Sequence, residues 1–212
     1  DQSGRLLCLR LGLHDHPEFR PTVVVGGTSG QKERVALNAD SWPTEDSNLR
    51  FPHNKHLKPA GVLVPSSREF RKLTCSACHQ PSGPGFVPIV MESQCGDCHL
   101  LNFEPAAPNR VLPHGDSDLV KITLREFYSK LAVHGGIEDK DAPEVLKRRR
   151  PGGRDRLSDA QKLEVVDWVD SKVQHATKRI FSPALCGTCH KIVERPDSSS
   201  PYQVAKVSIA NR

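Results

Sequence analysis

The feature that most constrains this chain is a five-residue pattern, Cys-x-x-Cys-His, which occurs three times. Each copy places two thiols three residues apart, on one side of a short turn, with a histidine directly after the second thiol. This is the attachment pattern of a c-type haem, in which the thiols bond the two vinyl groups of one porphyrin and the histidine becomes the proximal iron ligand. With 7 Cys and 10 His in 212 residues, composition alone would produce about 0.01 copies. We therefore predict three covalent haems, held by Cys75, Cys78, Cys95, Cys98, Cys186 and Cys189, with His79, His99 and His190 as proximal ligands.

The composition is lean for a chain that has to build its own hydrophobic core. Apolar residues make up 36% of the sequence and aromatic residues 5%, alongside 17 Pro and 15 Gly. Tethered porphyrins would supply apolar core that the side chains do not. We predict a mainly irregular, loop-rich fold with a few α-helices packed around covalent haems and minor β-structure in the N-terminal segment. The alternative is a partly disordered chain.

Charge and cysteine usage exclude other classes of protein. The formal net charge is +5, but six haem propionates and three ferric bis-imidazole irons would bring it to about +2. Neither this balance nor any aromatic–basic interleaving predicts nucleic-acid binding. The motifs use every cysteine except Cys8, so a disulfide framework is not expected. Cys8 is expected to be a small buried apolar residue.

Location follows from the chemistry of attachment. No run of about eighteen apolar residues is present, so no transmembrane segment is expected. The sequence shows neither an initiator Met nor a signal peptide. Because covalent c-type haem is attached outside the cytoplasm, we expect a periplasmic or extracellular protein. On this view the chain begins after a leader, or is an internal piece of a longer protein.

Four parts are predicted along the chain: an N-terminal β-rich segment without haem, a two-haem module, a charged linker, and a helix with the third motif and a C-terminal strand. Their bounds are 1–48, 49–137, 138–157 and 158–212. Short strands are expected at 5–9, 22–25, 34–37 and, alternating like an edge strand, 204–209.

Two helices are predicted from caps and apolar spacing. The first is capped by Asp116 or Ser117 and ended by Gly135, and the second begins with Ser158 and Gln161 as a capping box and ends before Pro183. Their apolar positions are, for the first helix, Val120, Leu124, Phe127 and Leu131, and for the second, Leu163, Val166, Val169 and Val173.

Candidate distal ligands come from two places. His53 and His56 lie three residues apart on one turn, at different heights, so they can reach two different irons, and Phe51 can pack on a porphyrin face. His114, held by Pro113 just before the first helix, is the third candidate. The rivals are His134, His175, His14 and His16, and the alternative for His53 and His56 is a pair of surface histidines.

The remaining sequence signals concern iron ligation and docking. Met91 is the only methionine and lies four residues before Cys95, too close to reach across that ring easily, so we expect it to pack against a porphyrin. All-histidine ligation would give low potentials. The run Lys147-Arg148-Arg149-Arg150 is interpreted as a solvated segment, with a docking patch for an acidic redox partner as the alternative.

The pattern Phe51-x-His53-x-x-His56 ahead of a Cys-x-x-Cys-His motif resembles the class III, low-potential multihaem cytochromes c. The succession NLRFPHNKHL, paired motifs, LPHGD, LREFY and a late third motif looks like part of larger bacterial multihaem proteins, with further haems beyond this chain. The resemblance implies that His53 is the distal ligand of the haem at His79, and that His56 serves a different haem, such as that at His190. The 86 residues between His99 and Cys186 depart from the compact family pattern.

The predicted function is electron transfer by three bis-His haem c groups rather than enzymatic catalysis. Only fifteen residues separate His79 from Cys95, so the first two haems must lie close together. One alternative is a multihaem reductase of small nitrogen or sulfur oxyanions, which needs an open iron and acid/base groups. Another is a subunit of an extracellular haem conduit or filament. Two motifs could instead form one zinc site, but the third would have no mate. The expected partners are other redox proteins or further haem modules, in an oligomer or larger complex.

Overall fold

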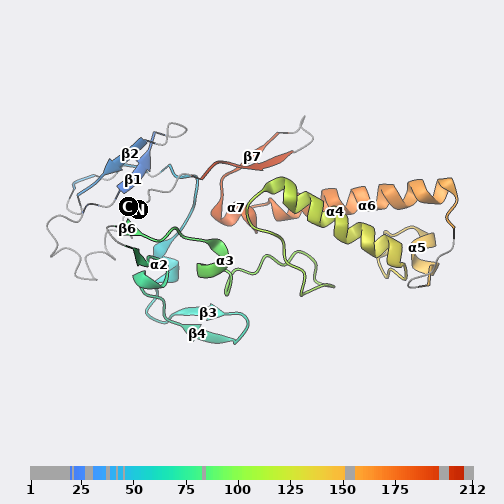
Figure 1. Cartoon of the computed structure of the whole chain (residues 1–212), viewed down its shortest axis with the longest axis horizontal. Helices are drawn as coiled ribbons and strands as arrows, with labels where there is room; N and C mark the ends of the chain where they lie inside the picture. The colour runs from blue at the N-terminus through green and yellow to red at the C-terminus, as the bar shows by residue number, and fades with distance from the viewer. Residues whose placement is uncertain are drawn as a thin grey trace. The chain divides into compact units, whose positions relative to one another are not determined.

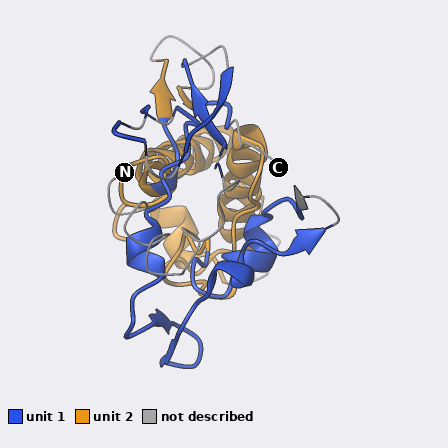
Figure 2. Ribbon diagram, turned by 90° about the vertical axis from the view of Figure 1, so that its left-hand side faces the viewer, with its two compact units in different colours: residues 1–100, 189–191, 204–212 blue, residues 101–188, 192–203 orange. Residues whose placement is uncertain are grey.

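A computed structural model describes residues 20, 22–26, 31–36, 39–41, 43, 44, 46–82, 85–150, 156–195 and 201–207. The chain forms two compact units (Figure 2): unit 1 contains residues 1–100, 189–191 and 204–212, and unit 2 contains residues 101–188 and 192–203. A few helices and small two-stranded sheets make up the regular structure (Figure 1). The expectation of a few helices is confirmed, whereas β-structure is not limited to the N-terminal segment. The predicted four-part division stays a prediction.

The described residues of unit 1 form three antiparallel hairpins. These pair β1 (Thr22–Val25) with β2 (Gln31–Arg34), β3 (Val62–Val64) with β4 (Glu69–Arg71), and β5 (Pro81–Ser82) with β6 (Gly85–Phe86). The strand predicted at 22–25 is confirmed, and the one predicted at 5–9 lies outside the described residues. The strand predicted at 34–37 is wrong in position. The second strand of this hairpin runs from Gln31, which pairs with Val25, to Arg34, which pairs with Thr22.

In the part of unit 1 that the structure describes, the helices are single turns: α2 (His53–His56), η3 (Cys75–Ala77) and α3 (Met91–Gln94). Among its described residues, the buried apolar side chains are those of Val24, Val35 and Val64. Isolated hairpins and one-turn helices are marginal in water unless they pack against something larger. The described side chains of unit 1 therefore do not form a core of ordinary size.

Unit 2 is built on a helical hairpin. Helices α4 (Ser117–His134) and α6 (Asp159–Ile180) lie side by side and antiparallel (Figure 1), and the shorter elements are α5 (Glu144–Arg148), α7 (Cys186–Cys189), β7 (Ile192–Glu194) and β8 (Tyr202–Val204). The rings of Tyr128 and Trp168 meet edge to face at 6.3 Å, and Arg125 pairs with Asp170 at 2.6 Å. The chain passes from one unit to the other within α7 and again within β8.

The predicted helix boundaries are confirmed. The Asp116 side chain accepts a hydrogen bond from the Asp118 N–H, and Gly135 follows the last residue of α4 with φ of 75°. Ser158 and Gln161 form the expected capping box. The C-terminal strand predicted at 204–209 is wrong in position, because β8 spans 202–204 and pairs with β7. No helix of the described part of the chain is long and apolar enough to cross a membrane.

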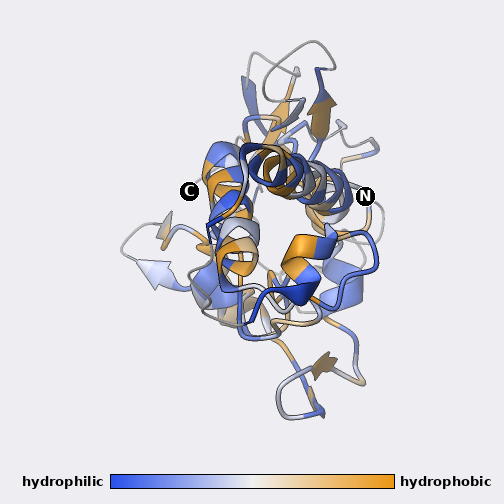
Figure 3. Ribbon diagram, turned by 90° about the vertical axis from the view of Figure 1, so that its right-hand side faces the viewer, coloured by the Kyte–Doolittle hydropathy of each residue, from blue (hydrophilic) through white to orange (hydrophobic). Residues whose placement is uncertain are grey.

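The hydrophobic core of unit 2 is extensive. Both long helices carry apolar and polar sides (Figure 3). Among the described residues of this unit, the buried apolar side chains are Phe103, Leu112, Val120, Leu124, Phe127, Tyr128, Ala132, Ala142, Leu146, Trp168, Val169, Ala176, Ile180 and Phe181. Of the predicted apolar face of α4, Val120, Leu124 and Phe127 are buried and Leu131 is half-buried. On α6, Leu163 and Val166 are 66% and 51% exposed, contrary to their predicted place on an inward stripe. Trp168 has the larger apolar surface, and turning it inward leaves Leu163 and Val166 outside.

Leu124 and Ile122 offer a matched test of this core on one helix. Leu124 is fully buried, whereas Ile122 is 64% exposed. Leu124→Ala is expected to lower the free energy of unfolding of unit 2 by about 2–5 kcal/mol, because it removes packed methyl groups and leaves a cavity. Ile122→Ala should change it by no more than about 0.5 kcal/mol. Urea unfolding followed by far-ultraviolet circular dichroism measures both, and equal effects would contradict the described burial.

Candidate haem-attachment site

Each Cys-x-x-Cys-His motif forms one helical turn. The His79 N–H donates to the Cys75 carbonyl at 2.8 Å, and the His99 N–H donates to the Cys95 carbonyl at 2.9 Å. The third motif forms α7. A helical turn brings residues i and i+3 to the same side, so both thiols of a motif are presented together. None of the six motif cysteines forms a disulfide, so each keeps the sulfur that covalent attachment requires.

The second and third motifs share a tight local packing at their glycines. The Gly96 N–H donates to the Met91 carbonyl at 2.8 Å, and the Gly187 N–H donates to the Ser182 carbonyl at 3.0 Å. A Cβ atom on Gly96 would lie 2.8 Å from the Glu92 oxygen, and one on Gly187 would lie 2.8 Å from the Ser182 oxygen. Because both obstacles are backbone atoms, no side chain fits at either position without moving the turn.

Gly96→Ala is therefore expected to displace the second motif. The overpacking should destabilise this turn by about 1–3 kcal/mol and lower the fraction of chains that carry a haem at Cys95 and Cys98. Ser76→Ala is the matched control, since Ser76 holds the same place in the first motif and is exposed. Intact-mass spectrometry counts covalent haems per chain, and full occupancy in Gly96→Ala would contradict the expected clash.

The distal candidates of α2 face the proximal histidines of the first two motifs. The ring centroids of His53 and His79 lie 6.4 Å apart with planes at 15°, and those of His56 and His99 lie 6.0 Å apart with planes at 49°. Two imidazoles on opposite sides of one metal, each with a metal–nitrogen bond of about 2.0 Å and about 1.2 Å from that nitrogen to the ring centre, would have centroids about 6.4 Å apart. Both pairs therefore have the spacing that axial ligation of one iron requires.

The chemistry of these rings also fits metal ligation. The Nδ1 atom of His56 lies 3.0 Å from the Pro52 carbonyl oxygen, so a proton on Nδ1 is donated there and Nε2 keeps its lone pair. Such a backbone partner is typical of a metal-binding histidine. The pKa of His53 is lowered, first by partial burial and then by the charges of His79 and His56. The lowered pKa favours the neutral imidazole, which is the form that binds metal.

Phe51 contacts both distal candidates. Its ring stacks on His56 at 4.4 Å with planes at 18°, and it meets His53 edge to face at 4.9 Å. The sequence predicts that Phe51 packs on a porphyrin, and the structure places its ring against the two imidazoles. A second aromatic ring, Phe86, lies 5.7 Å from His79.

The third motif is tied to the same turn by a long-range bridge. Leu49 and His190 form an antiparallel β-bridge, in which the Arg50 N–H donates to the Cys189 carbonyl at 2.6 Å and the Lys191 N–H donates to the Asn48 carbonyl at 3.2 Å. His190 is thereby held next to the segment that leads into α2. Sequence reasoning missed this contact, because a two-residue bridge between distant segments leaves no pattern in either one.

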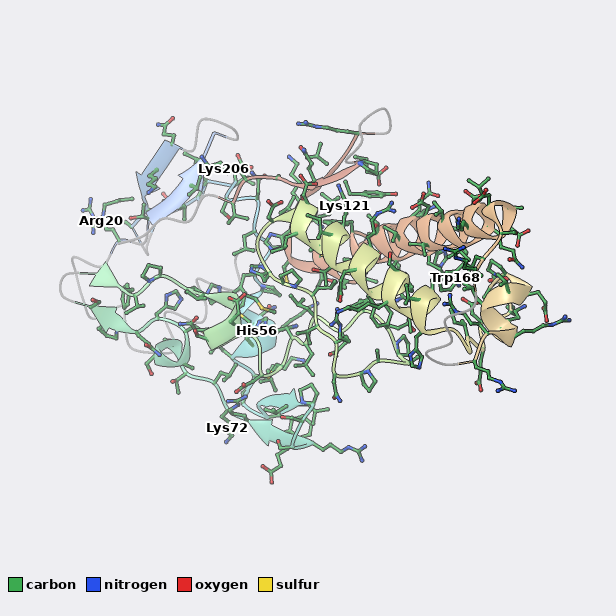
Figure 4. The ribbon with its side chains drawn as sticks, turned by 45° about the vertical axis from the view of Figure 1, so that its right-hand side comes forward. Arg20, His56, Lys72, Lys121, Trp168 and Lys206 are labelled. Atoms are coloured by element: carbon green, nitrogen blue, oxygen red, sulfur yellow. The ribbon has the colours of Figure 1, made fainter. Side chains whose placement is uncertain are left out.

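Five of the six motif cysteines belong to unit 1, namely Cys75, Cys78, Cys95, Cys98 and Cys189. Burial raises the pKa of the Cys95 thiol, and the neighbouring thiols of Cys78 and Cys189 raise it further. Burial also raises the pKa of Cys78 and of Cys189. Figure 4 shows sulfur atoms near the labelled His56. Residues of all three motifs thus lie in unit 1, the unit that contains α2.

The other sequence-predicted residues lie elsewhere. His114, His134 and His175 belong to unit 2 and are exposed. Within that unit, His114 precedes α4 at the end of the helical hairpin where α6 leads into Cys186, whereas His134 lies at the opposite end of an 18-residue helix, about 27 Å along its axis. Met91 begins α3, four residues before Cys95. His14, His16 and Cys8 lie outside the described residues.

The resemblance implied that His56 serves a haem such as that at His190. The structure instead brings His56 beside His99.

The described residues of unit 1 fit covalent haem. A porphyrin supplies four of the iron ligands, so the protein has to provide an axial pair and two thiols per haem. Exposed apolar side chains flank the motifs, namely Phe51, Phe86, Val87, Ile89, Val90 and Leu100. Exposed apolar surface of this kind is what a bound porphyrin would cover. Among the described residues, no three His, Cys, Asp or Glu side chains are grouped as a metal site.

Comparison of the chain with protein-family models, curated proteins and solved structures gave no match. The functional interpretation therefore rests on the motifs and on the geometry of unit 1.

Proposed function

We propose that this chain is an electron-transfer protein that carries three covalent c-type haems and passes electrons between closely placed irons. The observation that supports this most strongly is that both histidines of the α2 turn face a motif histidine, His53 facing His79 and His56 facing His99. Each pair contains the last residue of a Cys-x-x-Cys-His motif. Two histidines per iron favour electron transfer over catalysis, because neither axial position is left for a substrate.

Haem, when bound, supplies the one-electron iron couple, whose potential is lowered by bis-His ligation. The chain's own residues would perform three tasks. The paired thiols of each motif hold the porphyrin edge. The α2 turn places His53 opposite His79 and His56 opposite His99. Phe51 holds the rings of His53 and His56 in place. The Pro52 carbonyl fixes the tautomer of His56.

For the third haem we propose His190 as the proximal ligand, and His114 stays the distal candidate that the sequence offers. The bridge between Leu49 and His190 brings the third motif to the α2 turn, which would place its iron close to the other two. His114 is preferred over His134 because it lies at the Cys186 end of the α4–α6 hairpin. Since such haem is attached outside the cytoplasm, we propose a periplasmic or extracellular location with redox proteins as partners.

The test is a haem count on protein matured in cells that attach c-type haem. A reduced pyridine haemochrome spectrum combined with intact mass is expected to give three covalent haems per chain, and the ferric spectrum should be low-spin. Fewer than three haems, or zinc in their place, would contradict the proposal. A five-coordinate, high-spin iron with nitrite or hydroxylamine turnover would instead support the reductase alternative.

A further inference from the structure

The β3–β4 hairpin presents two different faces. Its register pairs Leu63 with Phe70 and Val64 with Glu69, and side chains of successive residues in a strand point to opposite faces. Leu63 and Phe70 share one face and are 51% and 68% exposed, whereas Val64 on the other face is only 8% exposed. An exposed aromatic–aliphatic pair on a two-stranded sheet leaves apolar surface in water. A partner that covered this face of the hairpin would therefore remove apolar surface from water.

The hairpin is anchored to the second haem motif by its inner face. Both terminal nitrogens of Arg71 lie 3.0 Å from Oδ2 of Asp97, which is inside that motif, and one lies 3.9 Å from the Cys98 sulfur. Gly61, with φ of +84°, lets the chain just before β3 lie close to the backbone of β4. A Cβ atom there would be 2.8 Å from the Arg71 oxygen. Because Arg71 points inward from β4, the pair Leu63–Phe70 points away from the motif.

The surroundings of this face are cationic. Residues 50–72 contain six Lys or Arg and one acidic residue, Glu69, whereas residues 73–109 contain no Lys or Arg. Arg68 forms the hairpin turn with φ of 58°, and Lys72, labelled in Figure 4, lies directly after β4, two residues beyond Phe70. Both side chains are exposed, and neither forms an ion pair with any residue in the described part of the chain. Figure 3 shows the apolar β3 strand beside hydrophilic residues of the hairpin.

We propose that the face formed by Leu63, Phe70, Arg68 and Lys72, which we term the hairpin face, is the docking surface for an acidic electron-transfer protein. An apolar centre rimmed by unpaired charge is the composition of a specific but transient interface. The positive rim selects a negatively charged partner and speeds its encounter. The Arg71–Asp97 link would place the docked partner close to the second haem motif. This inference rests on the proposed function, since it assigns an entry point for electrons.

The experiment uses the mature three-haem protein and a reduced acidic [2Fe–2S] ferredoxin, mixed by stopped flow at low and high ionic strength. Arg68→Glu with Lys72→Glu is expected to lower the second-order rate constant at low salt by about tenfold or more, with the difference shrinking at high salt. Leu63→Ser with Phe70→Ser should weaken binding by about tenfold at both salt concentrations. The matched control is Arg148→Glu with Arg150→Glu, which reverses two exposed arginines of the other basic run and should leave the rate unchanged.

Three outcomes would overturn the docking surface. The first is an unchanged rate constant in the hairpin variants. The second is a decrease in rate constant in the Arg148 and Arg150 control that equals or exceeds theirs. The third is that the hairpin variants bind anionic phospholipid vesicles more weakly but bind ferredoxin as well as the parent protein does. Reduction by methyl viologen radical, which needs no protein docking, should proceed equally in every variant. If the parent protein accepts no electrons from either donor, the proposed function fails. If the parent accepts electrons and the hairpin substitutions leave the rate constant unchanged, only the docking surface fails.

Discussion

Replacing all six motif cysteines with serine is expected to unfold unit 1 while leaving the helical hairpin of unit 2 intact. Among the described residues, unit 1 buries three apolar side chains and unit 2 buries fourteen. Without tethered porphyrins, the hairpins and single-turn helices of unit 1 would have too little apolar area to offset the loss of chain entropy. Unit 2 keeps its packed core of Leu124, Leu146, Trp168 and Ile180 and should remain folded.

Hydrogen exchange read by mass spectrometry separates the two units in one sample. Peptides within 46–100 should lose nearly all protection in the six-serine variant, whereas peptides within α4 and α6 should keep theirs. The control is Ser76→Ala, an exposed position inside the first motif that leaves all six motif cysteines in place and should leave both units protected. Protection of 46–100 without haem would show that side chains alone support unit 1, and would remove the argument that haem completes its core.

His53→Ala and His56→Ala are expected to change two different haems. Each substitution removes one ring from a facing pair, so each should convert about one of the three low-spin irons to a high-spin form and raise its potential. His53→Ala should affect the iron at His79, and His56→Ala the iron at His99. Because the ring planes meet at 15° in one pair and 49° in the other, the two low-spin signals should differ in electron paramagnetic resonance, so that each variant removes a different one.

Lys55→Ala is the matched control, since Lys55 lies on the same turn, is exposed and has no ring to offer. It should leave all low-spin signals unchanged. If His56→Ala changed the haem of the third motif and left that of His99 intact, the pairing implied by the family resemblance would stand and the observed ring pairing would not describe the ligation. If neither variant changed the spin state, α2 would be excluded as the source of distal ligands.

Local chemistry was the part of this molecule that could be predicted. Asp116, Ser158 and Gln161 cap their helices as expected, because these capping bonds join residues two or three apart. The motif turns are equally local. The position of β2 and the exposure of Leu163 were not predictable, because strand register depends on the partner strand and the buried side of α6 depends on which residues α4 offers.

The sequence by itself determined three attachment motifs, two capped helices and a turn with two histidines three residues apart, since each depends on contacts within a few residues. Only the tertiary structure decided that His53 faces His79 and His56 faces His99, and that the bridge from Leu49 to His190 brings the third motif to the same turn. It also decided that Arg71 directs Leu63 and Phe70 outward. These contacts join residues 26 to 141 positions apart. Such contacts are selected by which surfaces the whole fold can bury together, which no local pattern encodes.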